Sequence, residues 1–70
     1  MKNRLRDIRK SKRLTQLKVA MDLGLNQNSI SRYENGEREL TAETLVLFAD
    51  YYHVSVDYIL CRTEQNDPRE

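Results

Sequence analysis

Seventy residues with a single cysteine form at most one small domain, and that cysteine has no partner for an internal disulfide. The chain has no apolar run that could span a bilayer, no apolar segment of the signal-peptide kind, and no Cys/His pair with zinc spacing. These features argue against disulfide scaffolds, membrane spans and zinc fingers, and we expect a soluble cytoplasmic protein without metal or other cofactor.

Charge is unevenly distributed along the chain, although the net charge is only +1. Residues 1–38 carry ten Lys or Arg against four acids, whereas residues 39–70 carry two Arg against seven acids. A basic half and an acidic half suit a protein that presents one face to a polyanion. The alternative is that both faces merely keep a small helical protein in solution, and charge alone does not decide between them.

Helix caps and breakers divide the chain into short predicted helices. The first covers residues 3–12, where apolar residues recur three apart among charges. Thr15 is an N-cap for a second helix that ends at Leu23, because Gly24 can adopt the left-handed conformation that closes a helix. Two short helices therefore precede the middle of the chain.

The next two helices have limits of the same kind. Asn26 caps a third helix that runs to Asn35 and stops at Gly36. Thr41 caps a fourth helix, which ends at His53; this histidine has no partner at metal-ligand spacing, so we interpret it as a helix terminus. Apolar residues of the fourth helix recur at the helical spacing i, i+3, i+4 and i+7, namely Leu45, Phe48, Ala49 and Tyr52.

Ser55 caps a short fifth helix. Its apolar residues are expected to face inward: Val56, Ile59 and Leu60. No strand pattern, internal repeat or low-complexity linker interrupts this series. The sequence therefore predicts an all-α fold of five short helices around one small core, with the domain over residues 1–61 and a polar, frayed tail over residues 62–70.

The third predicted helix is polar on one side and apolar on the other. At about 100° per residue, four side chains that can hydrogen-bond to base edges fall within one arc: Gln27, Asn28, Ser31 and Arg32. Ile30 and Tyr33 fall on the opposite side as core anchors. Asn and Gln can bond adenine in a bidentate way, Arg can bond guanine, and Ser can serve either. The arc has the chemistry of base reading, although ordinary solvent-facing residues would have the same composition.

The preceding helix favours base reading. Residues 15–23, a glycine-containing turn and a second short helix reproduce the helix-turn-helix spacing, in which the second helix reads the major groove of DNA. The polar arc on the third helix is therefore a candidate DNA-reading surface.

The whole series of motifs resembles the Cro and phage-repressor helix-turn-helix family, also named for the xenobiotic response element. The matching pieces are L-T-Q at 14–16, V-A at 19–20, L-G-L at 23–25, S-I-S-R-Y-E-N-G at 29–36, T-L at 44–45 and V-S-V-D-Y-I-L at 54–60. The likeness extends from Leu5 to Leu60. It implies a lambda-repressor-like DNA-binding domain with a central helix-turn-helix.

The resemblance also implies roles for individual residues. The family's base-reading positions fall on Gln27, Asn28, Ser31 and Arg32. Its DNA-backbone positions fall on Thr15, Gln16, Asn35, Arg38 and Arg9. Arg9 and Glu34 match a pair that in some members forms a salt bridge between the first and third helices. Arg9 is thus assigned both to the backbone contact and to the structural pair.

The chain departs from the family pattern at three places. Arg13 stands where many members have Gly, so a residue with a possible positive φ is not a glycine. Glu37 and Glu39 lie in a loop that is often basic, where an acid would repel DNA. Leu40 and Ala42 replace the usual Pro and a larger apolar residue before the fourth helix.

The leading hypothesis is a sequence-specific double-stranded DNA-binding transcriptional regulator, a repressor that works by occupying its operator. A second class is an interaction module with the same fold, for instance an antitoxin or a bridging factor that binds protein, whose surface should be richer in apolar anchors. An enzyme is the poorest fit, because the sequence shows no nucleophile with a base, no paired acids in a recognisable motif and no phosphate loop.

The family likeness further implies a homodimer on a palindromic operator, because one recognition helix reads only a few base pairs. Helical wheels leave Leu47, Tyr51 and Tyr58 outside the core, and we predict that they form the dimer interface. The rival patch is Leu17 with Met21 on the second helix, which must also approach phosphate. Scattered exposed apolar residues are also normal on a protein surface.

Overall fold

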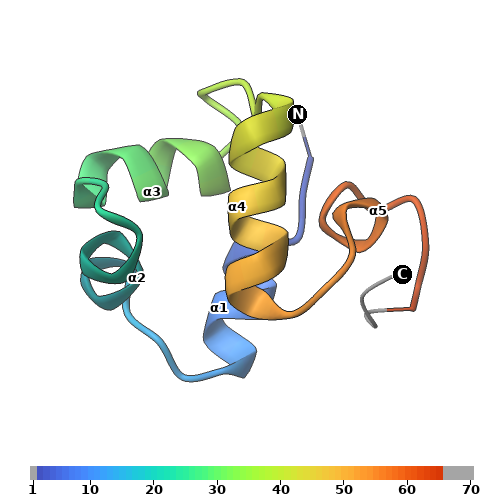
Figure 1. Cartoon of the computed structure of the whole chain (residues 1–70), viewed down its shortest axis with the longest axis horizontal. Coiled ribbons are helices and arrows are strands. Elements are labelled where there is room, and N and C mark those ends of the chain that lie inside the picture. Colours follow the sequence, from blue (N-terminus) through green and yellow to red (C-terminus); the bar gives the residue numbers. More distant parts are fainter. Residues whose placement is uncertain (1, 66–70) are drawn as a thin grey trace.

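The computed structural model describes residues 2–65 of the chain. Within this range the chain forms five helices and no strand (Figure 1), in the order α1 (Leu5–Ser11), α2 (Gln16–Leu23), α3 (Gln27–Glu34), α4 (Ala42–Tyr52) and α5 (Val56–Ile59). The predicted all-α fold and its five helices are confirmed. The first helix is shorter than predicted at both ends, and the third ends one residue early because Asn35 is its C-cap.

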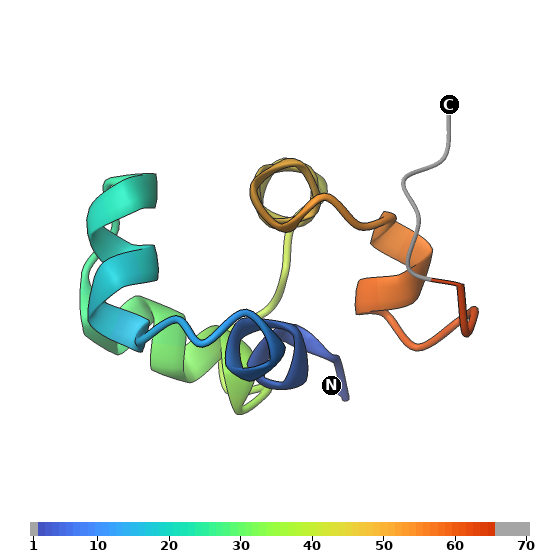
Figure 2. The same cartoon turned by 90° about the horizontal axis from the view of Figure 1, so that it is seen from below.

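The helices are arranged around α4. Seen from below in Figure 2, α4 is viewed almost along its axis, with α2 and α3 on one side and α5 on the other. The helix pair α2 and α3 packs together, and α1 contacts α3. This arrangement places the helix-turn-helix unit at one end of the molecule, where α3 has an open outer surface.

Side-chain caps define where four of the helices begin. The side-chain oxygens of Thr15, Asn26, Thr41 and Ser55 accept backbone N–H bonds three residues ahead, at 3.0, 2.8, 3.3 and 3.0 Å respectively. All four predicted caps are confirmed. Each such cap stabilises a helix by roughly 1 kcal/mol, which matters for helices of one to three turns.

Several residues at or just after helix ends have a left-handed backbone conformation. Gly24 closes α2 with φ of 70°, and His53 closes α4 with φ of 59°. Arg13 follows α1 with φ of 57°, as the sequence predicted from its replacement of a family glycine. A residue with a side chain in the left-handed conformation costs on the order of 1 kcal/mol relative to glycine. Arg13 and His53 therefore lower the stability of the fold slightly.

The core is made of eleven buried apolar residues drawn from all five helices and their connections: Leu5, Ile8, Val19, Ala20, Ile30, Leu40, Phe48, Ala49, Tyr52, Val54 and Ile59. Phe48 lies at its centre, in edge contact with Tyr33 at 5.8 Å and stacked on Tyr52 at 6.1 Å between ring centroids. Leu40, one of the departures from the family pattern, belongs to this core. A residue of α4 thus joins α3 to the rest of the domain.

The fifth helix is less buried than predicted. Ile59 is fully buried, but Val56 and Leu60 are only half-buried, and Leu60 is the C-cap rather than part of the helix. Val56 nevertheless packs against the core, so the predicted inward orientation is confirmed for Ile59 and Val56, whereas Leu60 is half-buried at the end of the helix. A helix of one turn presents only one side chain fully to the core.

Arg4 fastens the two ends of the described chain together. Its Nη1 donates to the carbonyl oxygens of Tyr58 at 2.6 Å and Thr63 at 2.8 Å, and its Nη2 donates to Glu64 at 3.1 Å. The guanidinium also lies 4.4 Å from the centre of the Tyr58 ring. The predicted frayed tail over 62–70 begins with residues that contact the domain, and residues 66–70 lie outside the described range.

Residues 2–65 contain neither a membrane-spanning helix nor a cluster of metal-ligating side chains. No helix there is long and apolar enough to cross a membrane. That part of the chain also brings together no group of three or more His, Cys, Asp or Glu side chains that could hold a metal ion.

Candidate nucleic-acid interface

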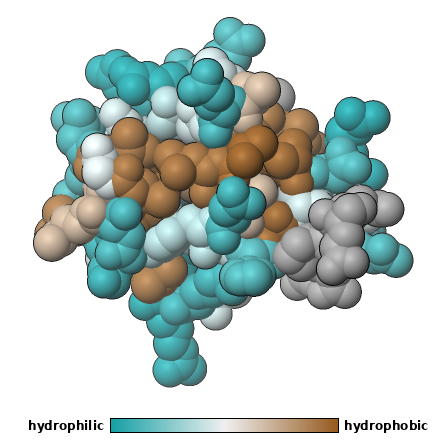
Figure 3. All heavy atoms as spheres, in the orientation of Figure 1, coloured by the Kyte–Doolittle hydropathy of each residue, from teal (hydrophilic) through white to brown (hydrophobic). Residues whose placement is uncertain are grey.

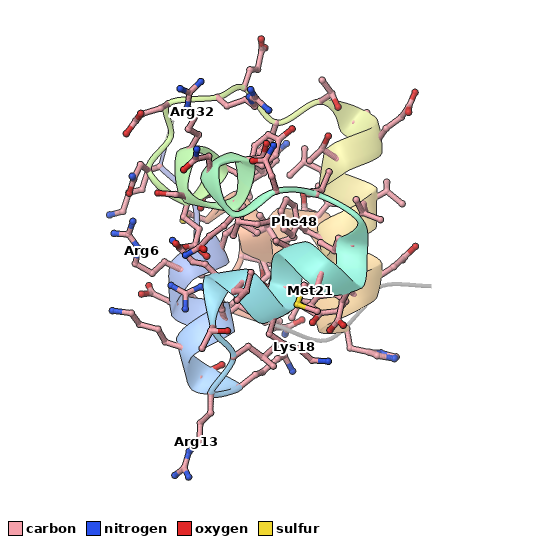
Figure 4. The ribbon with its side chains drawn as sticks, turned by 90° about the vertical axis from the view of Figure 1, so that its left-hand side faces the viewer. Arg6, Arg13, Lys18, Met21, Arg32 and Phe48 are labelled. Atoms are coloured by element: carbon pink, nitrogen blue, oxygen red, sulfur yellow. The ribbon has the colours of Figure 1, made fainter. Side chains whose placement is uncertain are left out.

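The polar arc of α3 lies on the surface, as the helical wheel predicted. Gln27, Asn28 and Arg32 are exposed, and Ser31 is half-buried. Ile30, on the opposite side, is fully buried. In Figure 4, Arg32 extends from α3 into solvent at the top left of the view. The four predicted base-reading side chains therefore share one open face of a helix whose other face is part of the core.

The start and the far side of α3 are held in place by short contacts. The Asn26 side chain accepts the backbone N–H of Ser29 at 2.8 Å, and the Ser29 hydroxyl oxygen accepts a hydrogen bond from Arg38 Nη1 at 3.1 Å. The Arg38 guanidinium also lies 5.7 Å from the centre of the Tyr33 ring. The loop after α3 thus folds back onto the helix and limits its movement, which favours accurate placement of the arc.

Arg9 and Glu34 form a buried ion pair between α1 and α3. Arg9 Nε donates to Glu34 Oε2 at 2.6 Å and Arg9 Nη2 donates to Glu34 Oε1 at 3.1 Å. A third guanidinium bond goes from Nη1 to the carbonyl oxygen of Leu14 at 2.9 Å. The hydrogen bonds with Glu34 raise the pKa of Arg9 further above its ordinary value. The pair between the first and third helices, inferred from the family likeness, is present.

The Glu34 carboxylate, on α3, accepts hydrogen bonds from side chains of both α1 and α2. Besides Arg9, it accepts from Gln16 Nε2 at 3.1 Å and from Arg6 Nε at 3.5 Å, both on Oε1. The Glu34 side chain is 1% exposed, so these bonds replace most of its hydration. We call Arg9, Glu34 and Gln16 the buried network; it fixes the last turn of α3 relative to α1 and to the first turn of α2.

The predicted DNA-backbone residues fall into two groups. Thr15, Gln16, Asn35 and Arg38 flank the polar arc: the first two lie where α2 begins, and the last two follow α3. Thr15, Asn35 and Arg38 are exposed and Gln16 is half-buried. Arg9 differs, because it is only 9% exposed and all its bonds are internal. In the structure Arg9 therefore makes the contacts of the structural pair, and its assignment to the DNA backbone stays a prediction.

Sequence reasoning missed Arg6 as a member of this surface. Its side chain is 44% exposed and its Nη2 donates to Asn35 Oδ1, while Nε reaches Glu34. Arg6 precedes Arg9 by three residues, so both lie on the same face of α1. That spacing, combined with the Arg9–Glu34 pair, was the signal that could have revealed it. In Figure 4, Arg6 and Arg32 both extend from the left of the molecule.

A second set of contacts joins α2 to α4 at the surface. The Tyr51 hydroxyl donates to Asp22 Oδ2 at 2.6 Å, and Lys18 Nζ lies 3.1 Å from Asp22 Oδ1. The bond from Tyr51, and then that from Lys18, lowers the pKa of Asp22. Desolvation and, secondarily, the bond to Asp22 raise the pKa of Tyr51 to about 12. We call Lys18, Asp22 and Tyr51 the exposed network.

These contacts also correct the predicted exposure of two tyrosines. Tyr51 and Tyr58 are half-buried against the core rather than outside it, and Tyr58 lies beneath the Arg4 guanidinium. Leu47 is 40% exposed, as predicted for a free surface residue. The adjoining Val46, 51% exposed, was not anticipated. Of the three proposed dimer residues, only Leu47 therefore offers an open apolar side chain.

Exposed apolar side chains occur on two helices. Leu17 and Met21 are 54% and 71% exposed on α2, and Met21 faces outward in Figure 4. Val46 and Leu47 occupy α4, and Figure 3 shows a band of hydrophobic residues across the face on which α4 lies. Between α4 and the loop after α3, Leu40, Leu45 and Leu60 line a groove together with the loop residues 36–39.

The chain is similar to a known protein family. A model of the helix-turn-helix family matches residues 5–59, a range that begins with α1 and ends with α5. The chain belongs to the Cro/C1-type helix-turn-helix family. This membership agrees with α2 and α3 as the helix-turn-helix unit and α3 as its second helix, and it confirms the family inferred from the sequence motifs.

Curated relatives share most of this chain. An uncharacterized HTH-type transcriptional regulator of Bacillus subtilis, YobD, is 39% identical over 94% of this chain and 59% of its own length. The Cryptic phage CTXphi transcriptional repressor RstR of Vibrio cholerae is 34% identical over 100% of this chain and 62% of its own. Antitoxin PezA of Streptococcus pneumoniae is 33% identical over 94% of this chain and 42% of its own.

The alignments cover most of this chain but only part of each relative. The chain spans between about two-fifths and three-fifths of their lengths. No solved structure matches the chain significantly. The similarity therefore concerns this domain and not the full activity of the longer proteins.

Proposed function

We propose that this protein is a sequence-specific double-stranded DNA-binding transcriptional regulator, a repressor that acts by occupying its operator in the cytoplasm. The observation that carries the proposal is the open arc of Gln27, Asn28, Ser31 and Arg32 on a short helix whose opposite face is fully buried. The names of the relatives YobD and RstR, a transcriptional regulator and a transcriptional repressor, support it. No chemical step is part of this function.

In the proposed complex α3 enters the major groove with its arc toward the base edges. Arg32 can bond guanine in a bidentate way, and Gln27 and Asn28 can do so with adenine. Thr15 and Gln16 at the start of α2, with Asn35 and Arg38 after α3, then face phosphates on either side of the groove. Such contacts set register and orientation, whereas the arc sets sequence preference.

Two copies of the domain would bind a palindromic operator with half-sites about one helical turn apart. Tyr51 and Tyr58 are engaged within the domain, so we now place the dimer contact on Leu47 together with Val46. Both lie on α4, in the acidic half of the chain. Pairing there would leave the basic surface of each copy free to face the duplex.

A second candidate is an interaction module in which the same fold binds a protein, as in an antitoxin. Its support is the relative named Antitoxin PezA, together with the exposed Leu17 and Met21 on α2. The polar arc weighs against it as the main role, because protein-binding surfaces usually depend on large apolar or aromatic anchors.

Selection of bound sequences from random duplex DNA tests the proposal directly. We expect enrichment of a palindrome whose half-sites change when Arg32 or Gln27 is replaced. Wild-type protein that enriches no sequence, while a folded state is verified by circular dichroism, would contradict the DNA-reading function and favour the interaction module. Enrichment of a single half-site without a palindrome would retain base reading but refute the dimer.

A further inference from the structure

The residues that follow α3 form a cluster of opposite charges on the proposed DNA side. Arg6 Nη2 donates to Asn35 Oδ1, and Asn35 Nδ2 donates to Glu37 Oε2 at 3.3 Å. The same amide nitrogen lies 3.5 Å from the Ser31 hydroxyl oxygen. Asn35 and Glu37 are exposed. An acid is thus bonded to a residue that the proposed complex would direct at phosphate.

The backbone fixes the position of Glu37. Gly36, with φ of 74°, reverses the chain after α3, and its N–H donates to the carbonyl oxygen of Tyr33 at 3.2 Å. The N–H groups of Glu37 and Arg38 both donate to the carbonyl oxygen of Arg32, at 2.9 and 3.3 Å. Glu37 is therefore held at the end of the helix that carries Arg32 and Ser31, within reach of Asn35.

Arg6 adds a partly exposed cation to the cluster. Its guanidinium lies over the rim of the buried network, where Nε is 3.5 Å from Glu34, but the side chain is still 44% exposed. Glu34 is already bonded to Arg9 at 2.6 Å, so its negative charge is largely balanced. An exposed guanidinium beside an amide N–H donor is suited to a phosphate oxygen, because both groups can donate to it.

We propose that Arg6 and Asn35 form one phosphate-contacting point, and that in the free protein the Glu37 carboxylate accepts the Asn35 amide N–H that a phosphate would otherwise accept. This inference rests on the proposed DNA-binding function and adds Arg6 to its contacts. A DNA phosphate that approaches this point must displace Glu37 from the Asn35 amide. Glu37 therefore weakens binding to every duplex, specific or not, because phosphate contacts carry no sequence information.

The loop supplies a matched control for this inference. Glu39 is also an exposed acid, two residues further on, and no bond joins it to Arg6 or Asn35. If negative charge acted only by general repulsion of DNA, Glu37 and Glu39 would weaken binding to a similar extent. Competition for the Asn35 amide predicts an effect for Glu37 alone, beyond what charge removal gives at Glu39.

The experiment compares Glu37→Gln with Glu39→Gln by fluorescence anisotropy on a random duplex and on the selected operator, at one fixed salt concentration. We expect Glu37→Gln to tighten binding about fivefold on both duplexes, the scale of one contact between charges in water, and Glu39→Gln to change it by less than about twofold. In a protein that also carries Arg6→Ala and Asn35→Ala, Glu37→Gln and Glu39→Gln should change the affinity to the same extent.

A measurement without DNA checks the contact in the free protein. Glu37→Gln should shift the NMR signal of the Asn35 side-chain amide, and Glu39→Gln should leave it in place. An Asn35 signal that is indifferent to Glu37, or equal gains in affinity for both variants, would overturn the displacement model and leave DNA binding intact. Absence of binding by the wild type and by both variants would instead contradict the proposed function.

Discussion

The helix-turn-helix unit is attached to the rest of the domain at its two ends by networks of opposite character. The buried network of Arg9, Glu34 and Gln16 joins α3 to α1 and α2, around a carboxylate with 1% exposure. The exposed network joins α2 to α4 through Asp22, whose side chain is 32% exposed, and Lys18, at 58%. The hydrogen bonds have similar lengths, but their surroundings differ.

The difference in burial shows which contact determines the position of α3. An exposed ion pair contributes about 0–1 kcal/mol because water solvates both partners nearly as well when they separate. Loss of one partner from a buried pair costs far more, since the remaining charge stays without compensation. The end of α3 is thus fixed firmly by Glu34, whereas the outer side of α2 depends on weaker contacts that also respond to salt and pH.

The largest expected effect is on the buried network. Arg9→Ala should lower the free energy of unfolding by about 3–5 kcal/mol, because it leaves the Glu34 carboxylate buried without its main partner. The double variant Arg9→Ala with Glu34→Ala should be more stable than additivity predicts. Urea unfolding of the four proteins gives the coupling free energy. Strict additivity would mean that the comparison between the two networks is unfounded.

Ile30→Ala tests the other attachment of α3, through the apolar core. The side chain is fully buried, so its truncation should cost about 2–5 kcal/mol of unfolding free energy. Asn28→Ala, on the exposed side of the same helix, is the matched control and should change stability by less than about 0.5 kcal/mol. Thermal and urea unfolding check both, and equal losses would show that α3 is not oriented as described.

A smaller effect is expected from Tyr51→Phe, which removes the hydroxyl that links α4 to α2. The pKa of Tyr51 is raised to about 12, so the neutral hydroxyl stabilises the folded state below pH 10.0, and this stabilisation is lost as pH rises toward 12. The pKa of Asp22 is lowered from 3.8, so its contribution is present above pH 3.8 and lost as pH falls through the folded-state value.

The wild type should therefore exceed Tyr51→Phe in melting temperature between these limits, by at most about 5 °C. The two should converge at the acid and alkaline ends of the range. Since the Lys18–Asp22 pair is at the surface and is retained in both proteins, 1 M salt should lower both melting temperatures by weakening it. A gap that is constant with pH would show that Tyr51 acts through packing alone, and the exposed network would then not hold α2.

The smallest effect concerns Arg13 in the turn between α1 and α2. Arg13→Gly should raise the free energy of unfolding by up to about 1 kcal/mol, because glycine adopts a φ of 57° without steric cost. The gain is limited by the greater freedom of glycine in the unfolded chain. Lys12→Gly, in the preceding position with φ of −96°, should instead destabilise. The reverse order in urea unfolding would contradict the assigned turn.

Local features of the fold could be predicted from the sequence because neighbouring residues determine them. The N-caps Thr15, Asn26, Thr41 and Ser55 and the closing Gly24 each act within one helical turn. The polar arc of α3 also follows from helical periodicity alone. The Arg9–Glu34 pair was inferred only through likeness to a family, since the two residues lie 25 positions apart.

Contacts between distant elements could not be read from helical wheels. A wheel places Tyr58 on the outer side of α5, but Arg4 from the other end of the chain covers it. It likewise places Tyr51 outside the core, yet Asp22 of α2 lies within hydrogen-bond distance. Arg6 joins the candidate site through Asn35, 29 positions away, for the same reason. The exposure and the contacts of each of these residues depend on tertiary packing, about which local spacing carries little information.

The central claim is that the exposed arc of α3 reads bases while the buried network holds it in place. Arg32→Ala, measured against Arg62→Ala as an exposed charge-matched control in the acidic half, tests it most directly by titration on the selected operator and on random duplex. We expect Arg32→Ala to lose about 1–3 kcal/mol of binding free energy on the operator beyond any loss on random DNA, with relaxed preference at one base position. Equal losses of affinity on the two duplexes would contradict it.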